Sequence, residues 1–495
     1  MLDVIEAWHT AVNAGDAPAA GALCTDDVQV DGGTGDLTAP VRVATAFGVA
    51  AGRISRVLRH TDLDGALRPR ASRRTTRSPR AGRVGRVALI KVDAEPAEVG
   101  FDPGRLTRID RHFRRYVDDG LLAGWTVAVS RRGRVAHLSH HGLRDLDAGL
   151  PVSDNTIWRI YSMTKPITSV AAMMLYEQGA LELTDPVARF IPSFADARVY
   201  NAGPALNPST IPVTEPVRVW HLLTHTSGLT YGFHHAHPVD EMYRLRGFEY
   251  SVPPGVDLAG ACDLLADIPL LFQPGTEWNY GVSTDVLGRV VEVASGQPFE
   301  TFLAEQVLGP LGMDETTWSV AEDDLDRLAT LYMRGSDGRL VANGLGEAAT
   351  RPPLLHAGGA GLVSTAGDYH RFTQMLLRGG ELDGVRLLGP RTVAFMTRNH
   401  LPGGADLEQI GRPIFAESAF RGVGFGLGFS TVVDVAAGKV LTSPGEYAWG
   451  GMASTAFYVD PVEEVTAMFF TQFLPSSTYP IRSRLRALVA QAVVS

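Results

Sequence analysis

Apolar residues recur with a helical period directly after the stretch Ile160–Ile167 (IYSMTKPI). They stand three and four positions apart, at Ile167, Val170, Ala171, Met174 and Leu175. This spacing predicts a helix with one buried face. Gly179 follows at a place where a glycine commonly ends a helix. Ser162 and Lys165 are three positions apart, so we expect both side chains on one face of the first turn.

Strand-like patterns occur at both ends of the longer, C-terminal part of the chain. Trp125–Ser130 and Val135–Ser139 alternate apolar and polar residues around a short Arg-Arg-Gly turn, which predicts a hairpin. Ala453–Val459 and Val465–Phe473 flank an acidic turn and predict a second hairpin. Because the strands lie at both ends, we expect one antiparallel sheet that is built from both.

The expected helices flank this sheet and fill the middle of the chain. Asp102-Pro103 opens a helix that runs through Val117, Thr184-Asp185-Pro186 begins another, and Ile481–Val494 is a closing amphipathic helix. We therefore predict an α+β fold for residues 92–495, an antiparallel sheet flanked by helices, with a helical subdomain inserted at roughly residues 151–350. The cleft between the two parts is the expected binding site.

Residues 1–67 form a separate segment, for which we predict a small α+β structure. Its expected helices and strands are Val4–Asn13, Pro18–Leu23, Val28–Val30 and Ile54–Leu58. The end segments 7–16 and 52–63 resemble the opening and closing segments of polyketide-cyclase-like α+β cone domains. Too few residues separate them to supply the middle strands of such a cone, so we interpret residues 1–67 as a shortened module. An irregular N-terminal extension is the alternative.

Residues 68–91 are predicted to be a linker. Arg68–Arg86 carries eight arginines among Pro, Ser, Thr and Gly and has no apolar period. Such a basic run can bind nucleic acid. It contains no aromatic residue and the chain as a whole has a net charge of −9, so we expect no nucleic-acid partner.

The composition is that of a soluble globular protein, with 45% hydrophobic and 20% charged residues among 495. No apolar run has the length of about 18 residues that a membrane span needs, and the N-terminus lacks the basic and apolar regions of a secretory signal. The two cysteines, Cys24 and Cys262, are far apart in sequence and suggest a reducing compartment rather than a disulfide framework. We therefore expect a cytoplasmic protein that binds no membrane.

The pair Ser162 and Lys165 has a chemical interpretation and a structural one. A serine hydroxyl is a weak nucleophile until a base removes its proton, and a lysine held neutral can be that base. Burial and a neighbouring cation favour the neutral amine. The structural alternative is a capping serine followed by an ordinary surface lysine. Ser-x-x-Lys occurs often by chance, so the neighbouring motifs must decide between these interpretations.

Further motifs follow the Ser162–Lys165 pair in a fixed order. They are Trp220–Leu229 (WHLLTHTSGL), Pro274–Ser283 (PGTEWNYGVS) continuing to Gly288, Gly358–Thr365 (GGAGLVST) and Trp449–Gly451 (WGG). In order and separation, residues 95–494 resemble the serine β-lactamase and penicillin-binding-protein superfamily, in particular its class C-like esterases (family VIII carboxylesterases). The resemblance implies the β-lactamase-like fold and a serine hydrolase activity without a cofactor or metal.

The resemblance also implies roles for individual residues. Ser162 matches the nucleophile that forms an acyl-enzyme, and Lys165 matches the base beside it. Tyr280 matches a tyrosine whose phenol oxygen exchanges protons with both. A phenol and an amine can share a proton when their environments bring the two pKa values together. Tyr280 could then carry the serine proton to the leaving alkoxide.

The edge strand carries the other expected site residues. The backbone N–H groups of Ser162 and Met452 are the expected oxyanion hole, and Gly450 and Gly451 allow that strand to approach the substrate closely. Trp449 begins the motif where penicillin-handling members have Lys-Thr-Gly or His-Thr-Gly. An indole offers one N–H donor and no charge for a lactam carboxylate. We therefore expect a preference for neutral esters, as in the esterase and acyltransferase members.

A second departure supports the same preference. Val282 stands where penicillin-handling members have the Asn of Tyr-x-Asn. The Gly-x-Ser-x-Gly motif of α/β-hydrolases does not occur in the chain, so ester chemistry would have to use Ser-x-x-Lys. The sequence thus predicts an enzyme that hydrolyses small or short-chain carboxylic esters. β-Lactamase, D-amino-acid peptidase or acyltransferase activity on the same residues remains open, as does a non-catalytic penicillin-binding-like sensor.

A histidine-rich segment lies directly after the Ser-Gly-Leu turn. His234, His235 and His237 are followed by Asp240 and Glu241. These are metal-ligating residue types, but their spacing is not that of a His-Glu-x-x-His zinc site, so we predict no metal. A loop that lines the substrate site is the more plausible role. The sequence does not indicate an oligomeric state.

Overall fold

The computed structural model describes residues 44–50, 53–60, 89–250, 252–412 and 420–495, the first two of these as backbone only. The chain divides into two compact units, Met1–Val84 and Gly85–Ser495. In the first unit, β1 (Ala44–Ala50) pairs antiparallel with β2 (Arg53–His60). The expected strand Ile54–Leu58 lies within β2, and β1 was not expected. The other elements predicted before residue 44 lie outside the described residues, and the boundaries 1–67 and 68–91 stay predictions.

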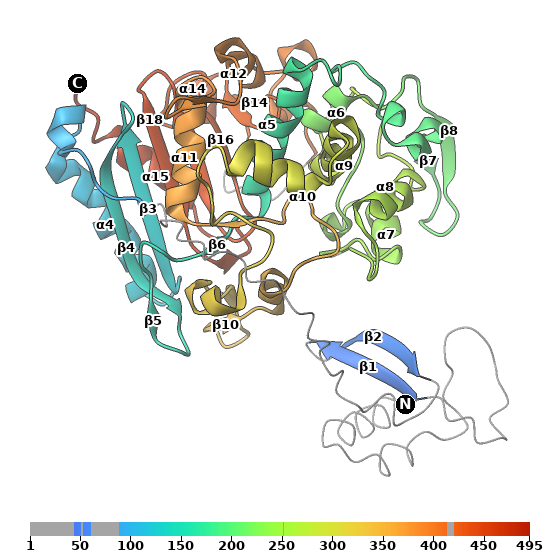
Figure 1. Cartoon of the computed structure of the whole chain (residues 1–495), viewed down its shortest axis with the longest axis horizontal. Helices are drawn as coiled ribbons and strands as arrows, with labels where there is room; N and C mark the ends of the chain where they lie inside the picture. The colour runs from blue at the N-terminus through green and yellow to red at the C-terminus, as the bar shows by residue number, and fades with distance from the viewer. Residues whose placement is uncertain (1–43, 51–52, 61–88, 251, 413–419) are drawn as a thin grey trace. The chain divides into compact units, whose positions relative to one another are not determined.

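The second unit is built around one eight-stranded antiparallel sheet (Figure 1). Its strands, in spatial order, are β14 (Val423–Phe425), β15 (Ser430–Val432), β16 (Tyr447–Gly450), β17 (Ala456–Asp460), β18 (Val465–Phe470), β3 (Gly124–Arg131), β4 (Arg134–Asp145) and β5 (Leu150–Pro151). The last long strand, β18, pairs antiparallel with the first, β3, over residues 126–131. This pairing confirms that both ends of the chain build one sheet.

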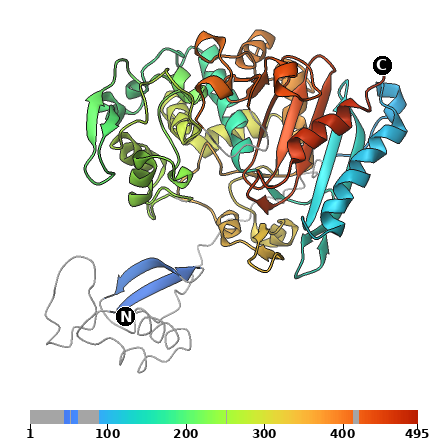
Figure 2. The same ribbon diagram turned by 180° about the vertical axis from the view of Figure 1, so that it is seen from behind.

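Both faces of the sheet are covered. The helices α4 (Pro103–Asp118) and α15 (Ile481–Ala490) pack together over one face, as Figure 2 shows from behind. The other face packs against α11 (Ala366–Leu377) and the larger core. Consequently β3 is buried at every position, and the expected alternation of buried and exposed residues is wrong for this strand. Ser130 is satisfied internally, because its Oγ shares a 2.6 Å hydrogen bond with Thr466 Oγ1. Thr126 Oγ1, in contrast, is buried without a hydrogen-bond partner among the described residues.

The inserted subdomain is mostly helical, as expected, but it also carries strands. Its helices are α5 (Thr164–Glu177), α6 (Val219–Leu223), α7 (Pro238–Leu245), α8 (Leu258–Ala266), α9 (Ser283–Ser295) and α10 (Phe299–Phe302). Its hairpin is β7 (Arg198–Ala202) with β8 (Ser209–Pro212). The other α-helices and strands of the second unit are β6 (Trp158–Arg159), β9 (Tyr332–Arg334), β10 (Leu340–Ala342), β11 (Val363–Ser364), β12 (Glu381–Leu382), β13 (Val385–Arg386), α12 (Pro390–Met396), α13 (Leu407–Ile410), α14 (Val435–Gly438) and β19 (Phe473–Leu474).

Three predicted helices differ from the observed ones. The helix α5 begins at Thr164, and Ser162 lies just before it in a 3₁₀ turn, Tyr161–Met163. All of α5 from Thr164 to Leu175 is buried, because core elements surround it, so the prediction of a single buried face is wrong. The helix expected at Thr184 is a single 3₁₀ turn, and α15 ends at Ala490 rather than Val494. Gly179 ends α5 with a positive φ of 71°, as predicted.

No helix among the described residues is long and apolar enough to cross a membrane.

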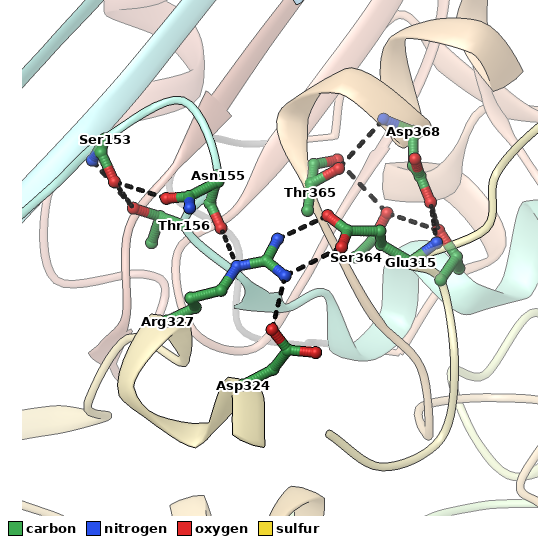
Figure 3. Close-up of polar contacts among 10 residues, drawn as sticks. Ser153, Asn155, Thr156, Glu315, Asp324, Arg327, Ser364, Thr365 and Asp368 are labelled. Atoms are coloured by element: carbon green, nitrogen blue, oxygen red, sulfur yellow. Dashed lines mark hydrogen bonds and ion pairs between the residues drawn. The ribbon is translucent and has the colours of Figure 1, made fainter. Parts of the chain in front are cut away.

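A network of polar side chains joins the start of α11 to the loop that carries Glu315 (Figure 3). Arg327 donates hydrogen bonds to Glu315, to Asp324 and to the carbonyl oxygen of Asn155. Asp368 accepts hydrogen bonds of 2.9 Å from the Glu315 N–H and from the Thr316 hydroxyl. Burial nevertheless raises the pKa of Asp368 to about 6, because the two hydrogen bonds offset only part of the cost of desolvating its charge.

We expect Asp368→Asn to stabilise the protein above pH 6 and to change little near pH 4. The pKa is higher in the folded state, so folding favours the protonated carboxyl and this stabilisation is lost as pH rises through 6. An asparagine carbonyl can keep both hydrogen bonds without a buried charge. The gain in the free energy of unfolding at about pH 8 should be on the order of 3 kcal/mol, measured by urea denaturation. Asp323→Asn, at an exposed position, is the control; a gain from Asp368→Asn that is independent of pH would contradict this account.

Candidate active site

Ser162 lies in the 3₁₀ turn Tyr161–Met163, at the N-terminal end of α5. The turn packs against β16, and Ser162 is half-buried. Pro166 stands in the first turn of α5, where its missing N–H costs no helical hydrogen bond. Tyr161 has a φ of 43°, a left-handed conformation that is uncommon for a residue with a side chain. Such strained positions concentrate at functional sites.

Lys165 is buried next to Ser162 and makes three hydrogen bonds. Its Nζ donates to Ser162 Oγ at 3.3 Å, to the Tyr231 hydroxyl at 2.9 Å and to the Gly359 carbonyl at 2.8 Å. The side chain is only 1% exposed. Three acceptors match the three protons of an ammonium group. The structure thus brings together the two residues of the Ser-x-x-Lys pair and orients the amine toward the serine.

Tyr231 is a site residue that the sequence analysis missed. It follows the Ser-Gly-Leu turn, and its hydroxyl oxygen accepts a hydrogen bond from Lys165 Nζ. Burial raises the pKa of Tyr231 well above its usual value, and the neighbouring Tyr280 and Asp285 raise it further. The phenol is therefore held in its neutral form. The only signal in the sequence was an aromatic residue directly after a motif, which does not distinguish it from a core residue.

Tyr280 lies on another side of the same amine. Lys165 Nζ is 4.6 Å from the centroid of the Tyr280 ring, a cation–π distance. The Tyr280 hydroxyl accepts a 3.2 Å hydrogen bond from Trp449 Nε1, and its ring packs edge-on against Tyr231. The residues of the expected trio thus meet around one amine, although they come from distant motifs. The role of Tyr280 in proton transfer stays a prediction.

The strand β16 was expected at the edge of the sheet, but it lies inside the sheet between β15 and β17. Its C-terminal end reaches the turn that carries Ser162, and a glycine makes this approach possible. A Cβ on Gly451 would lie 2.5 Å from the carbonyl oxygen of Ile160, two residues before the nucleophile. No side chain fits at that distance, which explains the glycine physically. Met452 follows in a turn and packs near Tyr161. Its N–H as an oxyanion donor remains a prediction.

Asp285 is a second site residue that the sequence analysis did not predict. It is linked to Lys165 through the backbone of Gly359. It lies in the first turn of α9 and accepts a 2.9 Å hydrogen bond from the Gly359 N–H. Gly359 in turn binds Lys165 through its carbonyl oxygen. Burial raises the pKa of Asp285, and the charge of Lys165 offsets part of this shift. The carboxylate thus positions the peptide that holds the amine.

His225 is buried beside these residues but is not arranged as a base. Burial, reinforced by the charge of Lys165, lowers the pKa of His225 well below its usual value. The ring packs against Tyr280 at 5.1 Å, and the residue has a φ of 55° in a tight turn. Ser227, next to it, shares a hydrogen bond with Ser283 Oγ at 2.8 Å. Both residues shape the turn.

The histidine-rich segment is used in helix capping. His237 caps α7 and accepts a hydrogen bond from the Val239 N–H, while Asp240 accepts from the Ala236 and His237 N–H groups. Among the described residues, no group of three or more His, Cys, Asp or Glu side chains is arranged to hold a metal ion.

Ser162 opens onto a cavity of about 990 Å³, large enough for a drug-sized ligand. Tyr231, Tyr280 and Trp449 line it beside the serine. Most of the remaining wall is apolar, and includes Leu258, Leu265, Val282, Trp318 and Leu355. A site of this kind suits a neutral, largely apolar substrate.

Known proteins are similar to most of this chain. A family model described as Beta-lactamase matches residues 109–491. Protein Rv1367c of Mycobacterium tuberculosis is 36% identical over 365 residues, which cover 73% of this chain and 88% of that protein. Esterase EstB of Burkholderia gladioli is 31% identical over 403 residues, 76% of this chain and 93% of the esterase.

A solved structure is similar over the same region. The structure titled EstCE1, a hydrolase with promiscuous acyltransferase activity, superposes with a TM-score of 0.67 and 27% identity. The match covers 78% of this chain and 99% of EstCE1.

Proposed function

This chain belongs to the Beta-lactamase family, and from that membership and the geometry of its site we propose that it is a serine hydrolase of small or short-chain carboxylic esters. The observation that carries the proposal is the hydrogen bond of 3.3 Å between Lys165 Nζ and Ser162 Oγ inside an apolar cavity. The expected fold is confirmed by the structural neighbours, and the relatives include an esterase.

The proposed reaction forms and breaks an ester on Ser162. The Lys165–Tyr280 pair accepts the hydroxyl proton as Ser162 Oγ attacks the substrate carbonyl. The N–H groups of Ser162 and Met452 stabilise the oxyanion. The same proton passes to the leaving alkoxide, and the alcohol departs. Water then attacks the acyl-enzyme by the reverse proton path and releases the acid.

Two residues of the cavity wall, Trp449 on β16 and Val282 before α9, support esters rather than lactams as the substrate class. Trp449 Nε1 already donates to the Tyr280 hydroxyl, so the indole offers no free donor to a substrate carboxylate. Val282, in place of an amide side chain, adds an apolar group to the cavity wall. Without a charge-assisted hydrogen bond to its carboxylate, a β-lactam is bound less favourably by about 1.5–3 kcal/mol.

Acyl transfer is a second candidate, which the described activity of EstCE1 favours. In that reaction an alcohol replaces water in the second step, with the same residues. The apolar wall of the cavity would favour an organic acceptor over water.

An ester panel tests both candidates. We expect p-nitrophenyl butyrate to be hydrolysed, nitrocefin to be turned over at least about 100-fold more slowly, and an acyl adduct to appear on Ser162 by mass spectrometry. An added primary alcohol that yields a new ester at the expense of the acid would indicate transferase activity. Faster turnover of nitrocefin than of the ester would contradict the ester proposal.

A further inference from the structure

One wall of the cavity is a ladder of aromatic rings that starts at the catalytic amine. The rings of Tyr231 and Phe233 stack with centroids 4.6 Å apart and an angle of 17° between their planes. Phe233 stacks in turn on Tyr250 at 5.1 Å and 4°. All three residues line the cavity, and Tyr250, at the outer end, is 53% exposed. The mechanism described above does not use Phe233 or Tyr250.

A contact between two exposed side chains links the two segments that carry the outer rings. His235 Nε2 lies 3.4 Å from Glu249 Oε1, so it joins the loop that carries Phe233 to the segment that carries Tyr250. His235 has a φ of 53°, which turns the chain directly after Phe233. The two outer rings therefore come from different segments, yet they lie nearly parallel. Because Phe233 is stacked between Tyr231 and Tyr250, the side of the ladder presents the edges of the rings to the cavity.

We propose that this ladder binds the alcohol part of the substrate and selects a flat aromatic ring system, such as a phenol or a naphthol. A planar ring that lies along the ladder can pack its face against the ring edges, and such edge-to-face aromatic pairs gain energy beyond the burial of their area. The Glu249 carboxylate beside Tyr250 disfavours an anionic ring substituent and favours a neutral one. The inference rests on the proposed ester hydrolysis and adds the class of alcohol.

The position of the first ring decides which half of the ester lies on the ladder. In the proposed mechanism the proton for the leaving oxygen comes from the Lys165–Tyr280 pair. Tyr231 is hydrogen-bonded to Lys165 and packs against the Tyr280 ring with centroids 5.5 Å apart, so the ladder begins beside this donor. The leaving oxygen must come within hydrogen-bond reach of that donor. The group attached to this oxygen is the alcohol, so the alcohol and not the acyl group extends along the rings.

The test compares esters in which only the position of the ring changes. 2-Naphthyl acetate places a ring on the alcohol, hexyl acetate has the same acyl group on an aliphatic alcohol, and ethyl 2-naphthoate places the ring on the acyl side. We expect Phe233→Leu to lower kcat/KM for 2-naphthyl acetate about tenfold, mainly through KM. Hexyl acetate and ethyl 2-naphthoate should change less than about twofold. Each variant is compared with the wild type on the same ester, so intrinsic reactivity cancels.

Two further variants keep the result interpretable. Tyr250→Leu removes the half-exposed outer ring, where little packing is lost, and should give a smaller loss of the same selectivity. Phe395→Leu removes a ring on α12 that does not line the cavity and should leave all three rates unchanged. An equal decrease of kcat/KM for all three esters, or a decrease for ethyl 2-naphthoate alone, would overturn the ladder proposal. Wild-type protein that hydrolyses none of the esters and forms no Ser162 adduct would instead refute the proposed function.

Discussion

Ser162→Ala is expected to lower kcat/KM for p-nitrophenyl butyrate by at least about 10³-fold and to abolish the acyl adduct. The reason is chemical, since Ser162 Oγ is the nucleophile of the proposed mechanism and carries the acyl group of the intermediate. The variant should fold, because Ser162 is half-buried and Lys165 keeps its bonds to Tyr231 and Gly359. Initial rates and mass spectrometry of the intact protein measure the two effects.

A second serine of the same helix provides the control. Ser169 Oγ is buried in α5 and has no hydrogen-bond partner in the described part of the chain, so Ser169→Ala removes a hydroxyl without breaking a bond seen there. We expect that variant to keep near wild-type turnover. Turnover that persists in Ser162→Ala, with an adduct elsewhere on the chain, would refute the Ser162 mechanism.

Tyr280→Phe is expected to lower kcat by about 10²–10³-fold, the range for loss of a general acid–base group. Tyr231→Phe should cost only about tenfold, the value of a hydrogen bond to a charged group. The difference arises because Lys165 without Tyr231 keeps two acceptors, Ser162 and Gly359, and stays oriented. Stopped-flow measurement of acylation and deacylation should show both steps slowed in Tyr280→Phe.

The relative size of the two losses identifies the proton carrier. If Tyr231→Phe is the more damaging change, the phenol bonded directly to Lys165 carries the proton and the role assigned to Tyr280 is wrong. Tyr161→Phe is the matched control, because its side chain lines the same cavity and its buried hydroxyl has no hydrogen-bond partner within the residues that the structure describes. We expect this third variant to be fully active.

The local features of the fold could be read from short patterns. The helix at Asp102-Pro103 begins as predicted, with the Asp102 side chain accepting from the Arg105 N–H. The hairpin β3–β4 also forms where the pattern indicated. Caps, turns and periodicity depend on neighbours within a few positions, and for that reason they are visible in one sequence.

The exposure of these elements to solvent could not be predicted from such short patterns. The helix α5 has a period of apolar residues but is buried on all sides, and β3 alternates in polarity but has no exposed face. Burial depends on what the rest of the chain places around an element. Polar residues such as Ser130 and Thr466 are satisfied inside by partners far apart in sequence.

For the site, the linear motifs specify the chemical groups: a serine and a lysine three residues apart, a tyrosine in a second motif, and a glycine pair at the end of a strand. The tertiary structure sets their geometry, and it puts that strand inside the sheet rather than at its edge. It placed Tyr231, rather than Tyr280, at hydrogen-bond distance from Lys165, and it linked Asp285 to the amine through Gly359. The physical reason is that a proton moves over about 3 Å. Residues tens of positions apart reach that distance only through the packing of the whole core.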